Sequence, residues 1–183
     1  MIVIISGTNR PGSNTRKVSA RVEALYRALG VETLVLDLAA LPADLFSPTA
    51  YAAKPAGFSH FTDPILAADG LVVVTPEYNG GMPGVLKYFI DMLPFPEGFE
   101  QRPVCFVGLA AGLWGALRPV EQLQTIFGYR NAYLFPERVF MPGINRVLDE
   151  AGQFTNPDTL ERLKSQAAGF VGFVETLRGK KLR

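Results

Sequence analysis

Five short runs of apolar residues recur along the chain, each followed by a turn and then by an amphipathic stretch. Their residues are mostly β-branched or aromatic, and several runs are apolar on both faces, which is typical of strands in a parallel sheet covered by helices. The pattern predicts strands at Ile2–Ser6, Glu32–Leu36, Leu71–Thr75, Val104–Leu109 and Ala132–Phe135.

Apolar residues spaced three or four apart predict helices after these runs. The stripes are Val18-Val22-Leu25-Leu29, Leu86-Phe89-Ile90-Leu93, Val120-Leu123-Ile126-Phe127 and Leu160-Leu163-Ala167-Phe170-Val174-Leu177. The last stripe has Asn156 as a candidate N-cap and Pro157 at the first helical position. Before Leu71 two interpretations stay open. Asp63-Pro64 could cap a short helix to Asp69, or Pro64 could lie inside a longer helix that begins near Ala56.

Alternating strands and helices predict an α/β fold with right-handed crossovers and a mostly parallel sheet. Five strands and five helices fit a three-layer doubly wound arrangement, which we expect to form one domain over residues 1–183. Such sheets bind ligands at the carboxyl ends of their strands, where the strand order reverses. The loops after Ser6, Thr75 and Leu109 are therefore the candidate binding loops.

The composition fits a compact globular protein and argues against several functional classes. Of 183 residues, 48% are hydrophobic and 19% are charged, which excludes intrinsic disorder. The 18 Lys and Arg against 17 Asp and Glu give a net charge of +1, without the basic excess typical of nucleic-acid binders. The single cysteine and the single histidine, His60, provide neither an internal disulfide nor a zinc cluster.

We expect a cytoplasmic protein without a membrane span. The apolar run Ile2–Ile5 follows no basic residue and is too short for a secretory signal. No stretch approaches the roughly 20 apolar residues that a spanning helix needs.

The first candidate loop reads SGTNRPGSNTRK and lies between a strand and a helix. The N-terminus of a helix exposes unpaired N–H groups and the positive end of its dipole, so it favours phosphate. Arg10 adds a full charge with a planar fork of donors. Short side-chain donors are also present at Ser6, Thr8, Ser13, Asn14 and Thr15.

Two other phosphate-binding motifs are excluded in this loop. Ser13 stands where the Walker motif needs lysine, and Asn9 occupies the third position of the dinucleotide fingerprint G-x-G-x-x-G. The remaining donors suit a terminal phosphomonoester. The alternative interpretation is an ordinary turn in which Ser13 or Asn14 caps the following helix.

The second loop reads TPEYNGGMPGVLKYFIDML and is rich in glycine and proline. Such a loop presents backbone N–H and C=O groups to a ligand at close range. Tyr78 adds an aromatic face and Asn79 an amide. This combination suits a planar heteroaromatic ring with mixed donors and acceptors.

Together the two loops resemble those of the NADPH-dependent FMN reductase family of flavodoxin-like proteins, which includes quinone, chromate and azo-dye reductases. The family pattern G-S-x-R-x-G-S is matched by Gly7–Ser13, and T-P-E-Y-N-x-x-x-P-G-x-L-K-x-x-I-D by Thr75–Asp91. The likeness covers about residues 1–178. It implies a five-stranded parallel sheet in the order 2-1-3-4-5, with FMN at the switch point between the first and third strands.

The resemblance also implies which residues contact FMN. Thr8, Arg10 and Ser13 would bind the phosphate, whereas Pro76, Glu77, Tyr78 and Asn79 would border the flavin ring. The third loop, LAAGLWGALR, would add contacts around Gly112 and Gly115. The expected cofactor-binding residues are Ser6, Thr8, Arg10, Ser13, Asn14, Thr15, Pro76, Glu77, Tyr78, Asn79, Gly80 and Gly112.

Three departures from the family pattern bear on this expectation. Thr8 replaces the usual serine but keeps its hydroxyl, and Met92 stands where tryptophan often follows the I-D pair. Ala110 and Ala111 stand where the third loop often carries serines. Because the alanines remove side-chain donors, a flavin-free scaffold stays open as an alternative.

The resemblance implies an oxidoreductase that binds FMN, takes electrons from NADPH or NADH, and passes them to a quinone, free flavin, azo compound or metal oxyanion. FMN would carry the chemistry, so no catalytic side chain and no metal are expected. One stacking site used alternately by donor and acceptor implies a ping-pong mechanism. Members of the family tend to form dimers through surfaces beside the active site, so the resemblance implies a homodimer or homotetramer. The alternative function is an FMN-binding electron-transfer or sensing module that does not turn over NADPH.

Three further residues allow more than one interpretation. Cys105 lies within an apolar strand and is expected to be a buried, inert thiol rather than a redox group. His60 is expected at the surface or at an interface rather than as a catalytic base. Trp114, in the third loop, could border the ring or the substrate entrance, or pack at a subunit contact.

Overall fold

The computed structural model describes residues 1–179, and the last four residues of the predicted 1–183 domain lie outside the described part. One parallel sheet runs through the molecule, with the strand order β2-β1-β3-β4-β5. This confirms the predicted order. The strands are β1 (Ile2–Ser6), β2 (Thr33–Asp37), β3 (Gly70–Pro76), β4 (Pro103–Ala110) and β5 (Tyr133–Pro142).

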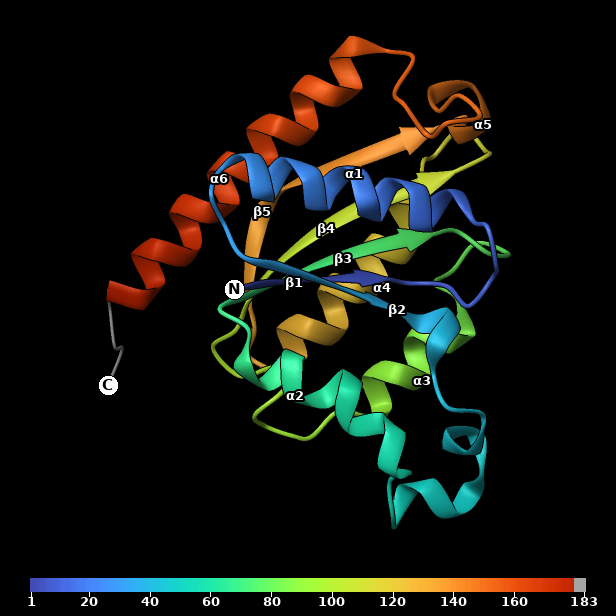
Figure 1. Ribbon diagram of the computed structural model, residues 1–183, viewed down its shortest axis with the longest axis vertical. Helices are drawn as coiled ribbons and strands as arrows, with labels where there is room; N and C mark the ends of the chain where they lie inside the picture. Colours follow the sequence, from blue (N-terminus) through green and yellow to red (C-terminus); the bar gives the residue numbers. More distant parts are fainter. Residues whose placement is uncertain (180–183) are drawn as a thin grey trace.

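Helices cover both faces of the sheet, as Figure 1 shows, so the predicted three layers are confirmed. One face carries α1 (Asn14–Ala28) and α6 (Pro157–Gly179), and the other carries α2 (Ser59–Ala67), α3 (Gly84–Met92) and α4 (Leu117–Tyr129). The side chains of β1 alternate between the two cores, because Ile2 and Ile4 pack with α1 and α6 whereas Val3 and Ile5 pack on the opposite side. No helix within residues 1–179 has the length and apolar character needed to cross a membrane.

The segment between β2 and β3 resolves the open choice before Leu71. A 3₁₀ turn, η4 (Ala56–Phe58), leads directly into α2, and Pro64 lies inside that helix. The interpretation of a longer helical segment beginning near Ala56 is therefore confirmed. Short turns that the periodicity did not predict are η1 (Leu38–Ala40), η2 (Ala43–Phe46), η3 (Pro48–Tyr51) and the single helical turn α5 (Ile144–Val147).

The predicted end of the last strand at Phe135 is wrong, because β5 continues to Pro142. The pairing of β4 with β5 is irregular between Val104 and Phe106, and beyond that point Phe106 pairs with Arg138. Gln166 of α6 is buried at this irregularity and donates from Nε2 to the carbonyl oxygens of Phe106 and Glu137, at 3.0 and 2.9 Å. Because β5 is an edge strand, it tolerates exposed polar residues. These residues interrupt the apolar run from which the strand was predicted, so the predicted strand ended too early.

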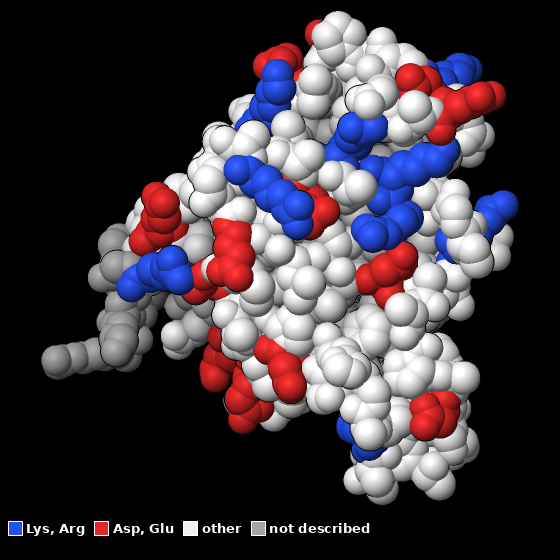
Figure 2. Space-filling view, viewed as in Figure 1, with Lys and Arg blue, Asp and Glu red and all other residues white. Residues whose placement is uncertain are grey.

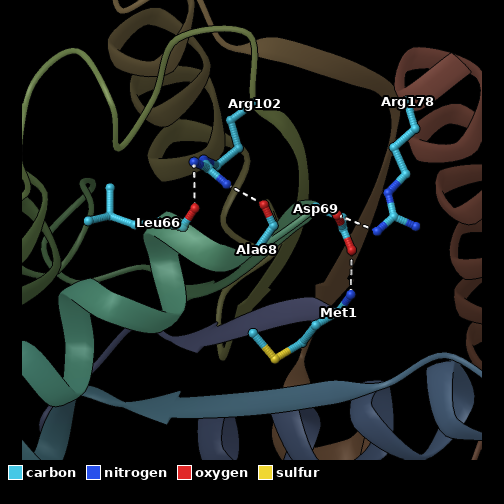
Figure 3. Close-up of polar contacts among 6 residues, drawn as sticks. All are labelled: Met1, Leu66, Ala68, Asp69, Arg102 and Arg178. Atoms are coloured by element: carbon cyan, nitrogen blue, oxygen red, sulfur yellow. Dashed lines mark hydrogen bonds and ion pairs between the residues drawn. The ribbon is translucent and has the colours of Figure 1, made fainter. Parts of the chain in front are cut away.

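A polar cluster fixes the amino ends of the strands, opposite the candidate loops (Figure 3). The Asp69 carboxylate contacts the Met1 ammonium and pairs with Arg178 of α6 at 2.6 Å. Arg102, just before β4, donates to backbone carbonyl oxygens of Leu66, Ala68 and Glu97. The cluster thus connects the start of the chain, α2, β4 and α6 at one edge of the sheet.

Candidate functional site

Three loops meet at the carboxyl edge of the sheet, toward which the strand arrows of Figure 1 point. They follow β1, β3 and β4, and adjacent parallel strands bring their ends to the same edge. Between them lies a hollow of about 460 Å³. It is lined by Arg10, Pro11, Gly12, Ser13, Asn14, Thr15, Pro76, Glu77, Tyr78, Leu109, Ala110, Ala111, Ile144 and Asn145.

One end of this hollow has features that favour an anion. Ser13 caps α1, and its Oγ accepts from the backbone N–H of Arg16 at 3.2 Å. The first residues of the 15-residue helix line the hollow, so amide groups without helical partners lie beside it. The Arg10 guanidinium also lines the hollow and has no hydrogen-bond or ion-pair partner within residues 1–179. The arrangement offers a positive charge and several N–H donors at one place.

Ser6 and Thr8 lie beneath this loop and do not line the hollow. Both are buried, and the Thr8 hydroxyl lies 2.8 Å from the Tyr78 hydroxyl while accepting from the Arg10 backbone N–H. Gly7 approaches β3 so closely that a Cβ at this position would lie 2.8 Å from the carbonyl oxygen of Val74. The structure therefore places Thr8 as a link between the first and second loops.

The second loop forms a tight hairpin at the end of β3. Tyr78 and Gly81 exchange two backbone hydrogen bonds of 3.0 and 3.1 Å, and the two residues between them, Asn79 and Gly80, have φ values of 53° and 77°. Paired positive φ values match the I′ type of two-residue turn, for which Asn-Gly is the preferred sequence. The side chain of Gln122 on α4 braces the hairpin by accepting from the Met82 N–H at 3.1 Å.

Asn79 and Gly80 border a second, smaller hollow of about 250 Å³ that adjoins the first. The two hollows share Glu77, Ala110 and Ala111. The two hollows are therefore neighbours at the carboxyl ends of β3 and β4. Gly112, Leu113, Trp114 and Arg118 complete the smaller hollow.

Glu77 lies where the hollows join, with its side chain only 12% exposed. Its Oε1 accepts from Arg118 Nη1 at 2.9 Å, and the Arg118 guanidinium lies over the ring of Trp114, 5.8 Å from its centroid. Its Oε2 is buried and has no partner in the described part of the chain. A buried carboxylate oxygen without a donor is costly, so a ligand that brings an N–H group to this point would satisfy it.

Two residues that line the larger hollow of about 460 Å³, called the main hollow below, were not predicted from the sequence: Ile144 and Asn145. They belong to the single turn α5 after β5, and the Asn14 amide donates to Asn145 Oδ1 at 3.0 Å. The stretch has no apolar periodicity and no recognised motif, and β5 itself ended too early in the prediction. Arg118 and Gln122 were missed because they lie on a helix assigned only by its apolar stripe.

The remaining candidates lie away from these loops. Cys105 is fully buried in the core beneath α1 and α6, which confirms the expectation of a buried thiol. Burial raises the pKa of this thiol and so disfavours the reactive thiolate. His60 is exposed at the side of the molecule near Val35 and Pro42. In residues 1–179, no three His, Cys, Asp or Glu side chains gather into a metal site.

The residues at the carboxyl edge fit FMN. Arg10 and the start of α1 match a terminal phosphate, and the Gly-containing hairpin leaves room for a flat ring against backbone. The unsatisfied Glu77 oxygen matches a heteroaromatic N–H donor. The third loop lines the same space through Leu109, Ala110 and Ala111, whose only polar groups are those of the backbone.

Comparisons with known proteins agree with this geometry. The sequence model described as NADPH-dependent FMN reductase matches residues 1–145. An NAD(P)H-dependent FMN reductase of Pseudomonas aeruginosa is 28% identical over 180 residues, covering 96% of this chain and 95% of the relative. A quinone reductase of Escherichia coli K12 is 29% identical, covering 97% and 96%.

The fold has close counterparts among solved structures. FerB of Paracoccus denitrificans, described as a flavoenzyme NAD(P)H:(acceptor) oxidoreductase, superposes with a TM-score of 0.80 at 22% identity, covering 96% of this chain and 97% of the other. That likeness supports the flavodoxin-like fold, and the family match extends over most of the chain. The chain therefore belongs to the NADPH-dependent FMN reductase family of oxidoreductases.

Proposed function

We propose that this protein binds FMN across the two adjoining hollows and uses NADPH or NADH to reduce a small acceptor. One observation carries the proposal. An anion site made by the unpaired Arg10 and the start of α1 opens onto a ring-sized space that contains the unsatisfied Glu77 oxygen. The phosphate of FMN would bind at the anion site, and its ring would fill the adjoining space and donate to Glu77.

In this arrangement Arg10, Ser13, Asn14 and Thr15 would hold the phosphate. The second loop would support the ring through Pro76, Glu77, Tyr78, Asn79 and Gly80, and Gly112 would add backbone contact from the third loop. Thr8 would act from beneath by linking the first and second loops rather than by touching the ligand. The Ser6 hydroxyl is buried without a hydrogen-bond partner within residues 1–179, so it makes no such link. Bound FMN would supply hydride acceptance and electron delivery, and the chain would orient it and exclude water from one face.

The smaller hollow is the place where donor and acceptor would meet the ring. Its walls include the exposed Trp114 and the Arg118 side chain that is held by Glu77. One hollow serving both molecules implies a ping-pong mechanism. Flat acceptors such as quinones, free flavins and azo compounds suit an aromatic wall, and a metal oxyanion suits the adjacent guanidinium. Relatives bear names that include quinone reductase, NADPH azoreductase and 2-hydroxy-1,4-benzoquinone reductase.

We also propose that residues 1–183 act as one domain in a cytoplasmic homodimer or homotetramer. Aromatic side chains stand exposed on the face near α3, with Phe46 at 47% and Tyr51 at 59% exposure, both against the ring of Tyr88. Burial of such a patch against a second copy would be favourable. Sedimentation equilibrium tests this, and a monomer at micromolar concentration would contradict it.

Steady-state kinetics of the FMN-loaded protein test the proposed activity. NADPH and benzoquinone are varied against each other, and double-reciprocal plots should give parallel lines because the two substrates react in separate half-reactions. Intersecting lines would contradict the ping-pong mechanism. Failure of NADPH to support any quinone reduction would favour the alternative, an FMN-binding electron-transfer or sensing module.

A further inference from the structure

The segment between β5 and α6, residues 143–156, connects two of the three candidate loops. At its start the Gly143 N–H donates to the carbonyl oxygen of Gly112 in the third loop, at 3.3 Å. Two residues later Asn145 accepts from the side chain of Asn14, at the start of α1, at 3.0 Å. The beginning of this β5–α6 segment therefore spans from the third loop to the first and forms a further wall of the main hollow.

Basic side chains of α1 hold the far part of the same segment. Arg21 donates from Nε to the carbonyl oxygen of Gly152 at 2.8 Å and from Nη2 to that of Ala151 at 3.1 Å. Lys17 donates to the carbonyl oxygen of Glu150 at 3.3 Å. Figure 2 shows that Lys and Arg side chains gather over this side of the molecule, where α1 runs in Figure 1. The segment is thus attached to α1 beyond the hollow as well as at its edge.

The segment is also braced internally behind Asn145. Thr155 donates from its hydroxyl to the carbonyl oxygen of Arg146 at 2.6 Å, and its N–H donates to that of Val147. These bonds connect the end of the β5–α6 segment, at Thr155, to α5 near the start of the segment. The backbone around Asn145 is therefore held by hydrogen bonds to the third loop, to α1 and within the segment itself. These contacts keep the Asn145 side chain at the hollow.

The hydrogen bond that Asn145 accepts from Asn14 determines which group of its side-chain amide remains free for a ligand. An asparagine amide has one acceptor oxygen and one NH₂ group with two donors. The Asn145 oxygen is engaged by Asn14, and its Nδ2 has no acceptor among residues 1–179. Asn145 shares the lining of the hollow with Arg10, Gly12 and Ser13, at the anion-binding end. Its unused donors therefore lie in the part of the hollow where negative charge would be held.

We propose that Asn145 is a phosphate-positioning residue for the flavin, delivered to the hollow by the β5–α6 segment and oriented by Asn14. The proposal rests on the proposed function, because it assumes that FMN occupies the main hollow. Arg21 would act through Asn145 from outside the hollow, by holding the segment that carries it.

Titration of FMN and riboflavin against two variants of Asn145 and one control variant tests the role of this residue. Riboflavin lacks the phosphate, so it reports on every contact except the one proposed. Asn145→Ala should weaken FMN binding about tenfold, the effect of losing one charge-assisted hydrogen bond at an exposed residue. Asn145→Asp keeps the shape but places a carboxylate beside the phosphate, so it should weaken FMN by a further factor of about ten. Both should leave riboflavin affinity within about threefold of wild type, the scatter expected for a site that is not contacted.

Asn131→Asp is the matched control. Asn131 is exposed in the turn before β5, at the opposite edge of the sheet, and receives the same change of charge. It should leave both affinities unchanged. Equal losses for FMN and riboflavin at position 145, or none for either, would overturn the proposal while wild-type FMN binding still stands. A wild-type protein that binds neither flavin would overturn the proposed function instead.

A double-mutant cycle tests the connection to Arg21. Arg21→Ala should weaken FMN about threefold by loosening the segment, and the Arg21→Ala/Asn145→Ala pair should be no weaker than Asn145→Ala alone. The matching thermal unfolding curves show whether each variant is folded. Strictly additive losses in the pair would show that Arg21 does not act through Asn145.

Discussion

At the scale of single residues, Arg10 has the clearest expected role. Its guanidinium lines the main hollow, and within residues 1–179 no carboxylate or other acceptor contacts it, whereas Arg16, Arg27 and Arg118 each pair with an acid. A cation kept without a partner beside helix amides is well placed for an incoming anion. The sequence motif predicted this residue, and the structure adds that no neighbouring acid competes for its charge.

Arg10→Ala should therefore reduce FMN affinity by about one to two powers of ten, from the loss of roughly 1.5–3 kcal/mol of charged hydrogen bonding. Riboflavin affinity should change little, because the phosphate is the proposed contact. Fluorescence quenching of both flavins measures this. Arg162→Ala, which removes an exposed charge of α6, is the control. Equal losses for the two flavins would mean that Arg10 supports the fold rather than the phosphate.

At the scale of elements, the hairpin after β3 determines the shape of the proposed ring site. Gly80 has a φ of 77°, which only glycine adopts without strain, and a Cβ there would find no backbone closer than 4 Å. A substitution at this point would therefore distort the turn through its backbone conformation rather than through a clash.

Gly80→Val should weaken FMN and riboflavin alike by about tenfold or more, because a β-branched residue at positive φ costs on the order of 1–3 kcal/mol. Circular dichroism should show the sheet unchanged. Gly84→Val is the matched control, since its added Cβ meets nothing within 4 Å and its φ is not positive. Unchanged flavin affinity in Gly80→Val would place the ring elsewhere.

The irregular pairing of β4 and β5 provides a test that concerns the fold alone. Gln166→Leu would leave the carbonyl oxygens of Phe106 and Glu137 without their donor in a buried place. We expect a loss of about 1–3 kcal/mol in the free energy of unfolding, measured by urea denaturation. Gln153→Leu, at an exposed side chain without a hydrogen bond within residues 1–179, should change it by less than about 0.5 kcal/mol. A Gln166→Leu variant as stable as wild type would show that water satisfies these carbonyls.

Elements with a strong apolar period were predictable, and those held by polar contacts were not. β1, β3, β4, α1 and α6 appear close to their predicted bounds because buried faces impose a regular pattern. β5 was predicted too short because the exposed residues Pro136, Glu137 and Arg138 interrupt its apolar pattern before the buried Val139 and Met141. Asn145 was missed because its place depends on a hydrogen bond from Asn14, 131 residues away in the sequence, which leaves no local signal.

Across the whole molecule, the carboxyl and amino ends of the strands differ in how far their polar groups are paired. Within the described residues 1–179, the carboxyl edge leaves a cation, helix amides and a carboxylate oxygen without partners, whereas the amino edge pairs Asp69 with both Met1 and Arg178. Burial of the Asp69 carboxyl opposes ionisation, but the two cations outweigh it and lower its pKa from the ordinary value. One edge thus contributes to stability and the other is available for a ligand.

Asp69→Asn should lower the melting temperature by about 2–4 °C near neutral pH, from roughly 1 kcal/mol for a solvent-screened pair. Because the folded-state pKa lies below the unfolded value of about 3.9, this stabilisation is present above that value and is lost as the pH falls through the folded-state pKa. The difference from wild type should therefore shrink below about pH 4. Glu175→Gln, an exposed change on α6, is the control. A difference that grows in acid would contradict the assignment.

Anaerobic mixing of the FMN-loaded protein with NADPH in a stopped-flow spectrometer tests the proposed flavin reduction most directly. If the protein is an NADPH-dependent flavin reductase whose loops hold FMN at the carboxyl edge, the visible absorbance of the bound flavin should bleach rapidly. A quinone added afterwards should restore it without oxygen. Bound flavin that keeps its colour in excess NADPH and NADH would contradict the account.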